Sequence, residues 1–257
     1  MKNYFDLTGR VALITGCSTG LGVQMANALA SQGANIVALA RRENLVKEVA
    51  KDLEEKYGVK AIGVPCDITD TNRVEEAVAT VMKEFGRIDI LINNAGTGAV
   101  APAQDITDDQ FANEVNIDLF GTFKVAREVA KQAMIPAGYG RIINIASMYG
   151  LVGNKIAPAS PYHAAKGGVV NLTRALACEW ADKGITVNAI CPGYFETPLT
   201  KETLDSEFFQ EYAKVTIPMA RYGKEGELDT AAIFLASPFS TYVNGAILPV
   251  DGGYVSL

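Results

Sequence analysis

Short, β-branched runs recur along this chain between longer stretches of helical character, and this alternation limits the possible folds more than any other feature. The seven runs are Val11–Thr15, Asn35–Ala40, Ala61–Pro65, Ile88–Asn93, Arg141–Ala146, Thr186–Cys191 and Ala246–Val250. Most are apolar throughout, as expected for parallel strands that are covered on both faces. The pattern predicts an α/β fold with a doubly wound, seven-stranded parallel sheet and helices on both faces.

The chain is predicted to form one domain over residues 1–257. These 257 residues, 49% of them hydrophobic, can bury one large core, and no linker or low-complexity tract marks a boundary. The irregular segment is Pro192–Gly226, which follows a strand and has a short amphipathic pattern over Leu204–Val215. Because ligands bind beyond the carboxyl ends of strands in such sheets, we expect a substrate lid here. The alternative is a surface loop without a role.

Charge and cysteine spacing exclude several classes of function. The 23 basic and 29 acidic residues give a net charge of −6, which argues against binding to a phosphate backbone. No segment has the apolar length needed to cross a bilayer, and the start lacks the apolar run of a secretory signal. The four cysteines are widely spaced and have no histidine cluster beside them, so we expect no metal site. We therefore expect a cytoplasmic protein that binds neither nucleic acid nor membrane.

A glycine-rich turn, TGCSTGLG, follows the first predicted strand and precedes a helical pattern. Its glycines permit a tight turn and close backbone approach, and a helix N-terminus favours a pyrophosphate. The spacing GxxxGxG differs from the common GxGxxG, so the turn alone could also be an ordinary connection. Its place in a βαβ unit favours a dinucleotide site. We assign cofactor contacts to Gly16, Ser18, Thr19, Gly20, Leu21 and Gly22.

The second predicted strand ends in Ala40 and is followed by Arg41 and Arg42. Dinucleotide folds that hold a ribose 2′-hydroxyl place an acidic residue here, and Ala40 cannot act in that way. Arg41, with Arg42, can instead bind a 2′-phosphate, which favours NADP over NAD. Two solvated arginines at the start of a helix are the alternative interpretation.

The next two predicted strands also end in polar residues, Asp67-Ile68 and Asn93-Asn94-Ala95-Gly96. Asp67 could accept a hydrogen bond from an adenine amine, and the second group could form a wall beside the ribose. Turn chemistry explains the same residue types equally well. The predicted cofactor contacts from these strand ends are Asp67, Ile68, Asn94, Ala95 and Gly96.

Tyr162 and Lys166 lie four residues apart at the start of a helical pattern, on one helix face. A nearby ammonium group favours the phenolate, so this tyrosine can donate or accept the proton of carbonyl reduction or alcohol oxidation. Ser147 ends the fifth predicted strand, where its hydroxyl can polarise the same carbonyl. Asn116, a polar residue in an apolar helical stretch, could hold a water near Lys166 or be an ordinary helix-interior asparagine. His163, the single histidine, would project about 100° away from Tyr162, so we do not expect it to be catalytic.

These motifs together resemble the short-chain dehydrogenase/reductase family over essentially the whole chain. The resemblance rests on the TGCSTGLG turn, NNAG, Asn116, Ser147, YHAAK, Pro192-Gly193 with Thr197, and Asp251-Gly252-Gly253. It implies a single Rossmann-type domain, a homotetramer, and a catalytic tetrad of Asn116, Ser147, Tyr162 and Lys166. It also implies that Lys166 holds the nicotinamide ribose and that Thr197 lies near the carboxamide. The further cofactor contacts are Tyr162, Lys166, Pro192, Gly193, Phe195 and Thr197.

The substrate is less constrained than the chemistry. The segments after Pro192 and Ile217 resemble polyol and sugar-acid members such as gluconate 5-dehydrogenases, and 3-oxoacyl carrier-protein reductases almost as well. Bile-acid hydroxysteroid dehydrogenases fit the apolar lid residues, which could also form a subunit contact. Those lid residues are Phe195, Leu199, Leu204, Phe208 and Phe209. A non-enzymatic alternative is a redox sensor that binds NADP(H) without turnover.

Overall fold

The computed structural model describes residues 2–98, 100–156, 158–198 and 200–256, and it confirms the predicted α/β fold. Seven parallel strands form one sheet in the order β3-β2-β1-β4-β5-β6-β7. The strands are β1 (Val11–Thr15), β2 (Asn35–Ala40), β3 (Ala61–Pro65), β4 (Ile90–Asn93), β5 (Gly140–Ile145), β6 (Ile185–Pro192) and β7 (Ile247–Val250). The strand order reverses between β1 and β4, which is where such sheets bind ligands.

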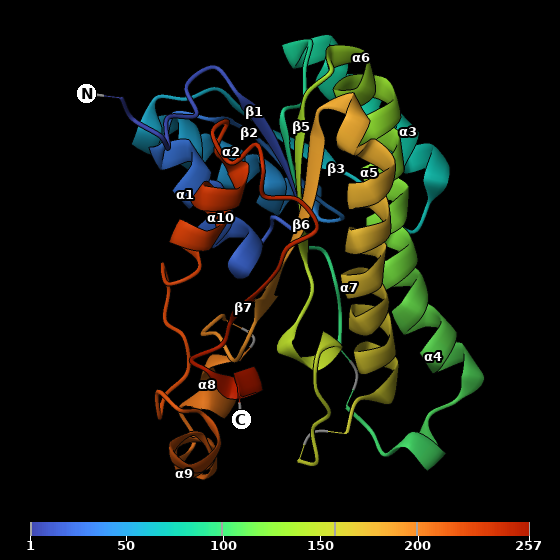
Figure 1. Cartoon of the computed structure of the whole chain (residues 1–257), viewed down its shortest axis with the longest axis vertical. Coiled ribbons are helices and arrows are strands. Elements are labelled where there is room, and N and C mark those ends of the chain that lie inside the picture. The colour runs from blue at the N-terminus through green and yellow to red at the C-terminus, as the bar shows by residue number, and fades with distance from the viewer. Residues whose placement is uncertain (1, 99, 157, 199, 257) are drawn as a thin grey trace.

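Helices cover both faces of the sheet (Figure 1). Helices α1, α2 and α10 lie on one face, and α3, α5 and α7 on the other. The helices are α1 (Leu21–Ser31), α2 (Glu43–Tyr57), α3 (Thr71–Phe85), α4 (Asp108–Val115), α5 (Thr122–Val129), α6 (Ile135–Ala137), α7 (Ser160–Trp180), α8 (Lys201–Leu204), α9 (Glu207–Thr216) and α10 (Asp229–Ala236). Two π-helical stretches, η2 (Asn116–Gly121) and η3 (Ala130–Met134), connect α4, α5 and α6. Short 3₁₀ turns are η1 (Ala103–Asp105), η4 (Met148–Gly150), η5 (Ala181–Lys183) and η6 (Tyr254–Ser256).

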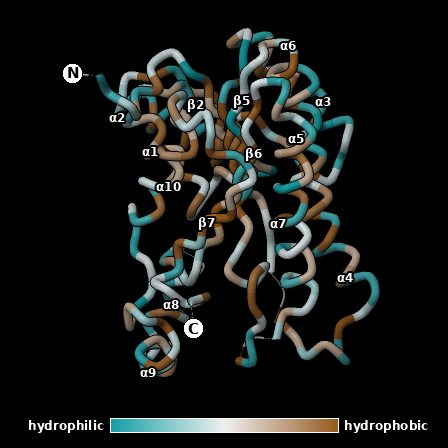
Figure 2. The backbone as a smooth tube through the Cα atoms, viewed as in Figure 1, coloured by the Kyte–Doolittle hydropathy of each residue, from teal (hydrophilic) through white to brown (hydrophobic). Residues whose placement is uncertain are grey.

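Successive residues of β1 enter opposite halves of the core, because side chains alternate across a strand. Ala12 and Ile14 pack under α1 and α10, whereas Val11 and Leu13 pack under α3 and α5. Apolar segments accordingly gather around the sheet, and polar ones along the outer helices and loops (Figure 2). This two-sided burial is why the strand sequences lack alternation.

Strand β4 begins two residues later than predicted, at Ile90 rather than Ile88. The carboxylate of Asp89 accepts the backbone N–H of Val11 at 2.9 Å and binds Arg10 at 2.8 Å. The Asp89 side chain therefore provides part of the hydrogen bonding between the strands where β1 and β4 begin. The remaining predicted strand limits differ from the observed ones by one residue at most.

The segment predicted as a lid contains α8 and α9 and has its own small core. Leu204, Phe209 and Ala213 are buried there with Ile217. Figure 1 shows this unit below the carboxyl edge of the sheet, near the end of β7.

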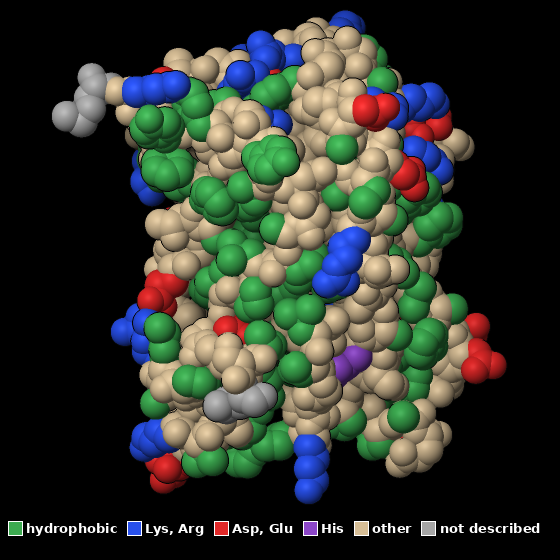
Figure 3. Space-filling view, viewed as in Figure 1, with side chains coloured by type: hydrophobic (Ala, Val, Ile, Leu, Met, Phe, Trp, Pro, Cys, Tyr) green, Lys and Arg blue, Asp and Glu red, His purple; other side chains and the backbone are tan. Residues whose placement is uncertain are grey.

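Neither a membrane span nor a metal cluster is found in the described residues. No helix among them is long and apolar enough to cross a bilayer, and no group of three His, Cys, Asp or Glu side chains could hold a metal. On the face shown in Figure 3, Lys and Arg side chains are scattered rather than gathered in one patch.

Candidate active site

A cavity of about 840 Å³ lies at the carboxyl edge of the sheet, where β1 to β4 end. The predicted cofactor residues that line it are Gly16, Ser18, Thr19, Arg41, Arg42, Asp67, Ile68, Ala95 and Gly96. Sequence reasoning missed the lining residues Leu39, Ala40, Cys66, Thr69, Thr97, Asn113 and Ile117. Most of these flank the predicted strand-end residues, so their position near the carboxyl end of a strand was the available signal.

The glycine-rich turn forms a cradle that side chains would fill. Gly16 has a positive φ of 65°, and a Cβ there would lie 2.8 Å from the Cα of Ala95. A Cβ on Gly22 would lie 2.5 Å from the carbonyl oxygen of Gly16. Helix α1 starts beside this turn, and no side chain caps its N-terminus. The turn therefore fits a pyrophosphate group, which needs close backbone approach and free N–H donors.

Several predicted contacts support the cradle instead of lining the cavity. Gly20 and Leu21 stand at the start of α1 and are not among the residues that line the cavity. The side-chain amide of Asn94 donates to the carbonyl oxygens of Thr15 at 3.0 Å and Gly16 at 3.3 Å. These bonds tie the ends of β1 and β4 together.

Arg42 reaches over the cavity and donates from Nη2 to Ser18 Oγ at 3.0 Å. Arg41 lies beside it and is close enough to Asp67 to affect its ionisation. Burial acts to raise the pKa of Asp67, but hydrogen bonds from Thr69 and the charge of Arg41 lower it overall. Two guanidinium groups and a serine hydroxyl thus meet at the end of β2, a donor set that fits a phosphate.

The segment after β6 returns to the glycine-rich turn. A Cβ on Gly20 would lie 3.4 Å from Thr197 Cγ2, and Gln24 Nε2 donates to the carbonyl oxygen of Glu196 at 3.3 Å. Thr197 therefore lies at the end of the cofactor cradle nearest the lid. Pro192 ends β6, and the N–H of Gly193 bonds to Val250 at 2.9 Å.

The structure does not support a side-chain contact between Phe195 and the cofactor. Phe195 is 5% exposed and belongs to the apolar core. Its ring packs on Gly223, where an added Cβ would lie 2.6 Å from Phe195 Cε1. An aromatic ring at this position is stabilised more by burial than by facing a polar cavity. Only the backbone of Phe195 could face the cofactor.

Tyr162 and Lys166 lie on α7 beside the carboxyl end of β5, and Ser147 follows that strand. Tyr162 is half-buried on the first turn of α7, and Gly98 lies over its ring. Lys166 is buried one turn later, with Nζ 5.5 Å from the centre of the Tyr162 ring and 3.1 Å from the carbonyl oxygen of Ile145. Ser147 is buried directly after β5 and accepts the N–H of Tyr149 at 3.1 Å.

Asp118, not Asn116, lies against Lys166. Asp118 Oδ2 is 3.1 Å from Lys166 Nζ, and its other oxygen accepts the N–H of Thr97 at 2.8 Å. Asn116 lines a separate apolar groove with Phe120 and other residues. Two positions apart on a helix means roughly opposite faces, so Asn116 points away when Asp118 points inward. This corrects the predicted position of Asn116. The missed signal was a carboxylate inside an apolar helical stretch, which requires a partner when buried.

Phenol hydroxyls from distant segments gather beside Tyr162. The Tyr149 hydroxyl lies 2.6 Å from that of Tyr194, and Tyr212 bonds to Tyr254 at 3.0 Å. Asn154 donates to Tyr149 and, at 3.1 Å, to Tyr194. Burial raises the pKa of Tyr149 and of Tyr194, which keeps both hydroxyls protonated. We call Tyr149, Asn154, Tyr194, Tyr212 and Tyr254 the hydroxyl cluster.

His163 packs behind this cluster instead of facing Tyr162. Its ring stacks on Tyr149 at 4.6 Å, and Nδ1 lies 2.8 Å from the carbonyl oxygen of Ala159. The placement agrees with the expected divergence of neighbouring side chains on a helix.

Two of the five predicted apolar lid residues are buried within the lid itself, and Phe195 is buried in the main core. Leu204 and Phe209 are 2% and 5% exposed, whereas Phe208 is 69% exposed. Leu199 lies outside the described residues. The lid therefore offers hydroxyl groups near Tyr162 and uses its apolar side chains for its own packing.

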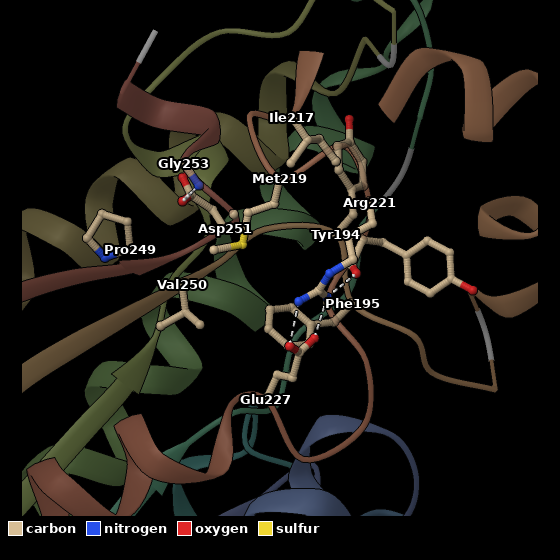
Figure 4. Close-up of a pocket in the computed structure, with 13 residues that line it drawn as sticks. Tyr194, Phe195, Ile217, Met219, Arg221, Glu227, Pro249, Val250, Asp251 and Gly253 are labelled. Atoms are coloured by element: carbon tan, nitrogen blue, oxygen red, sulfur yellow. Dashed lines mark hydrogen bonds and ion pairs between the residues drawn. The ribbon is translucent and has the colours of Figure 1, made fainter. Parts of the chain in front are cut away.

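A smaller cavity of about 340 Å³ separates the end of β7 from the segment after α9 (Figure 4). Ile217 and Met219 border it, and a two-bond ion pair between Arg221 and Glu227 lies at one side. The carboxylate accepts at 2.6 and 2.7 Å. This bidentate geometry fixes the loop that carries Gly223 against Phe195.

Almost the whole chain is similar to a family model and to known dehydrogenases. The family model described as enoyl-(acyl carrier protein) reductase matches residues 16–255. Gluconate 5-dehydrogenase of Gluconobacter oxydans is 37% identical over 97% of this chain and 96% of its own length. Galactitol 2-dehydrogenase of Cereibacter sphaeroides is 36% identical over 98% of both chains. A crystal structure of a gluconate 5-dehydrogenase from Burkholderia cenocepacia, in complex with NADP and tartrate, has a TM-score of 0.93 and 38% identity, covering 99% of this chain and 98% of that one.

Proposed function

Because the chain belongs to the short-chain dehydrogenase/reductase family, we propose that it interconverts a secondary alcohol and a ketone of a polyhydroxylated substrate with NADP(H). The observation that carries this proposal is the position of Lys166 Nζ, 5.5 Å from the centre of the Tyr162 ring and 3.1 Å from the carbonyl oxygen of Ile145, two residues before Ser147. Gly96, which lines the cavity, packs against the same ammonium group. Bound NADP(H) would supply or accept the hydride. The cavity, the cradle and the cationic end of β2 together fit this cofactor.

In carbonyl reduction, the Tyr162 hydroxyl gives its proton to the carbonyl oxygen as the hydride reaches the carbon. Ser147 lies at the end of β5 and stabilises the developing charge on that oxygen by hydrogen bonding. Lys166 keeps a charged ammonium near the ring, because the attraction of Tyr162 and Asp118 outweighs the burial that by itself would lower its pKa. Alcohol oxidation uses the same groups in reverse.

Cofactor preference is assigned to the end of β2. Ser18 and the two guanidinium groups of Arg41 and Arg42 would hold the 2′-phosphate of NADP. Asp67 and Ile68 line the same cavity and would contact the adenine, and Thr197, which lies next to Gly20, would contact the nicotinamide. NAD lacks the 2′-phosphate and would leave these cations unpaired. We therefore propose that the protein uses NAD less well than NADP.

The hydroxyl cluster favours a polyol or sugar-acid substrate over a steroid or an acyl chain. Phenol and amide groups at Tyr149, Asn154, Tyr194 and Tyr212 can each exchange a hydrogen bond with a substrate hydroxyl. A site built for such bonds rejects analogues that leave its polar groups unpaired. Polyhydroxylated compounds are also named for the two relatives above.

A panel of substrates tests this proposal directly. Turnover is measured by nicotinamide absorbance with sugar acids, polyols, 3-oxoacyl thioesters and hydroxysteroids, each with NADP(H) and NAD(H). We expect the highest kcat/KM for a polyol or sugar acid with NADP(H). Higher kcat/KM for an acyl thioester or a hydroxysteroid would contradict the substrate assignment. Tight NADPH binding without turnover of any substrate would favour the redox-sensor interpretation.

We further propose that the protein forms a homotetramer in the cytoplasm. An apolar groove of about 630 Å³ follows η2 and α7, and its lining includes Leu119, Phe120, Phe123 and Leu172. Phe120 is 49% exposed and stacks on Phe123 at 6.2 Å. A second copy of the chain is the occupant that the family resemblance implies for this groove.

A further inference from the structure

The carboxylate of Asp118 lies directly behind the groups that move the proton. Asp118 is fully buried, and its partner Lys166 is only 5% exposed. One carboxylate oxygen lies 3.1 Å from the ammonium nitrogen, and the other accepts the N–H of Thr97. The same ammonium lies 5.5 Å from the centre of the Tyr162 ring. The buried ion pair and the half-buried phenol therefore form one group of interacting side chains.

The chain leaves space for this pair at Gly96. A Cβ there would lie 2.9 Å from Asp118 Oδ2 and 3.2 Å from Lys166 Nζ. Any larger residue would have to displace one of the two charged groups, both of which are held by backbone bonds. The ion pair is thus built into the wall of the site, next to the cofactor cavity that Gly96 also lines.

Other titratable groups face Lys166 from each neighbouring element. Tyr162 faces it from α7, Glu114 from α4 and Cys191 from β6. Burial raises the pKa of Cys191 to about 11, so this thiol is neutral at ordinary pH. Glu114 is buried and adds a second carboxyl group on the side of Asp118. The acidic groups around this lysine therefore lie on the side of α4 and η2.

A carboxylate next to Lys166 changes the electrostatic potential at the phenol of Tyr162. An ammonium group alone favours the phenolate, because opposite charges attract. A carboxylate in contact with that ammonium repels the phenolate and cancels part of the attraction. The neutral amide that the family resemblance implied for the tetrad would have no such effect.

We propose that Asp118 is a positioning residue that offsets the charge of Lys166 beside Tyr162 and so sets the pH range in which the site transfers its proton. This inference rests on the proposed oxidoreductase function. It assigns the site to carbonyl reduction near neutral pH, with alcohol oxidation requiring a more alkaline medium. The proton leaves the Tyr162 hydroxyl for the carbonyl oxygen, and Lys166 stays charged throughout.

The pH dependence of Asp118→Asn tests the proposal. The amide keeps the size of the side chain and an acceptor for Thr97, but removes the charge. We expect the pH of half-maximal alcohol oxidation to fall by about one unit, since a neighbouring charge at this range shifts ionisation by about one to three units. Cofactor KM should change less than twofold. Asp109→Asn, an exposed acid on α4, is the matched control and should leave the profile unchanged. An unchanged or alkaline-shifted profile for Asp118→Asn would overturn the proposal.

A titration without turnover separates this inference from the proposed function. The phenolate signal of Tyr162 is the ultraviolet absorbance of the protein with Tyr162 minus that of the otherwise identical protein with Tyr162→Phe. That signal should appear at lower pH in the Asp118→Asn background than in the unaltered one. Asp118→Ser, which also removes the charge, should give the same direction if the asparagine variant does not fold. A common midpoint, or one shifted to higher pH, would contradict the role of Asp118 even if the enzyme were fully active. A midpoint shifted to lower pH would support it even if no substrate were turned over.

Discussion

Replacing Arg42 by alanine removes the guanidinium that is fixed to the glycine-rich turn by its bond to Ser18 at 3.0 Å. A hydrogen bond to a charged group contributes about 1.5–3 kcal/mol, and about 1.4 kcal/mol corresponds to a tenfold change in affinity. Loss of one bond to a 2′-phosphate therefore predicts a roughly 10- to 150-fold weaker affinity for NADPH. Because Arg42 is exposed, screening by water and salt places the expected value near the lower end, at about tenfold.

The assay is a fluorescence titration of NADPH and NADH with the unaltered protein and the Arg42→Ala variant. Affinity for NADH should change less than twofold, because it has no 2′-phosphate. Lys51→Ala removes an exposed cation from the same helix, α2, and should leave both affinities unchanged. Arg41→Asp should shift the preference between NADPH and NADH towards NADH. An unchanged NADPH to NADH ratio in both arginine variants would refute the 2′-phosphate argument.

Three further results are expected. Lys166→Met leaves the buried Asp118 carboxylate unpaired and should lower the free energy of unfolding in urea by about 3–5 kcal/mol; adding Asp118→Asn should restore most of it, and no recovery would contradict the pairing. The hydrogen bonds from Arg221 lower the pKa of Glu227 from 4.5 to about 2, so the stabilisation is complete above pH 4.5 and is lost as the pH falls through 2. The melting temperatures of the unaltered protein and Glu227→Gln should therefore converge on acidification. A difference in melting temperature that does not change with pH would contradict the stabilising role of Glu227. Phe120→Asp should reduce the molecular mass measured by light scattering below that of four subunits. An intact tetramer would exclude the groove on η2 and α7 as a subunit interface.

The strands and the glycine-rich turn after β1 could be predicted because short-range patterns determine them. A run such as Val11–Thr15 is almost entirely apolar, as expected for a strand inside a parallel sheet, and the glycines after it permit a tight turn into α1. The topology then brings the ends of β1 to β4 to one edge, so Gly16, Asp67 and Gly96 share a cavity as expected.

The partner of Lys166 could not be identified from the presence of a polar residue in a helical stretch. Both Asn116 and Asp118 meet that description, and their orientation depends on how α4 continues into the wider π-helical stretch η2. The hydroxyl cluster was missed for another reason. Tyr149, Tyr194 and Tyr254 are far apart in the sequence, and only the packing of the lid against the end of β5 brings their hydroxyls together.

Removal of the phenol oxygen of Tyr162 tests the central claim most directly. Tyr162→Phe keeps the ring beside Lys166 and Gly98 but removes the proton donor. The measurement is kcat for the best substrate of the panel together with the dissociation constant of NADPH on the same preparation. We expect kcat to fall by about 10²- to 10⁴-fold, the contribution of a positioned acid or base, with NADPH affinity within a few fold of the unaltered protein. Undiminished turnover, or loss of NADPH binding in place of turnover, would contradict the assignment of Tyr162 as the proton donor.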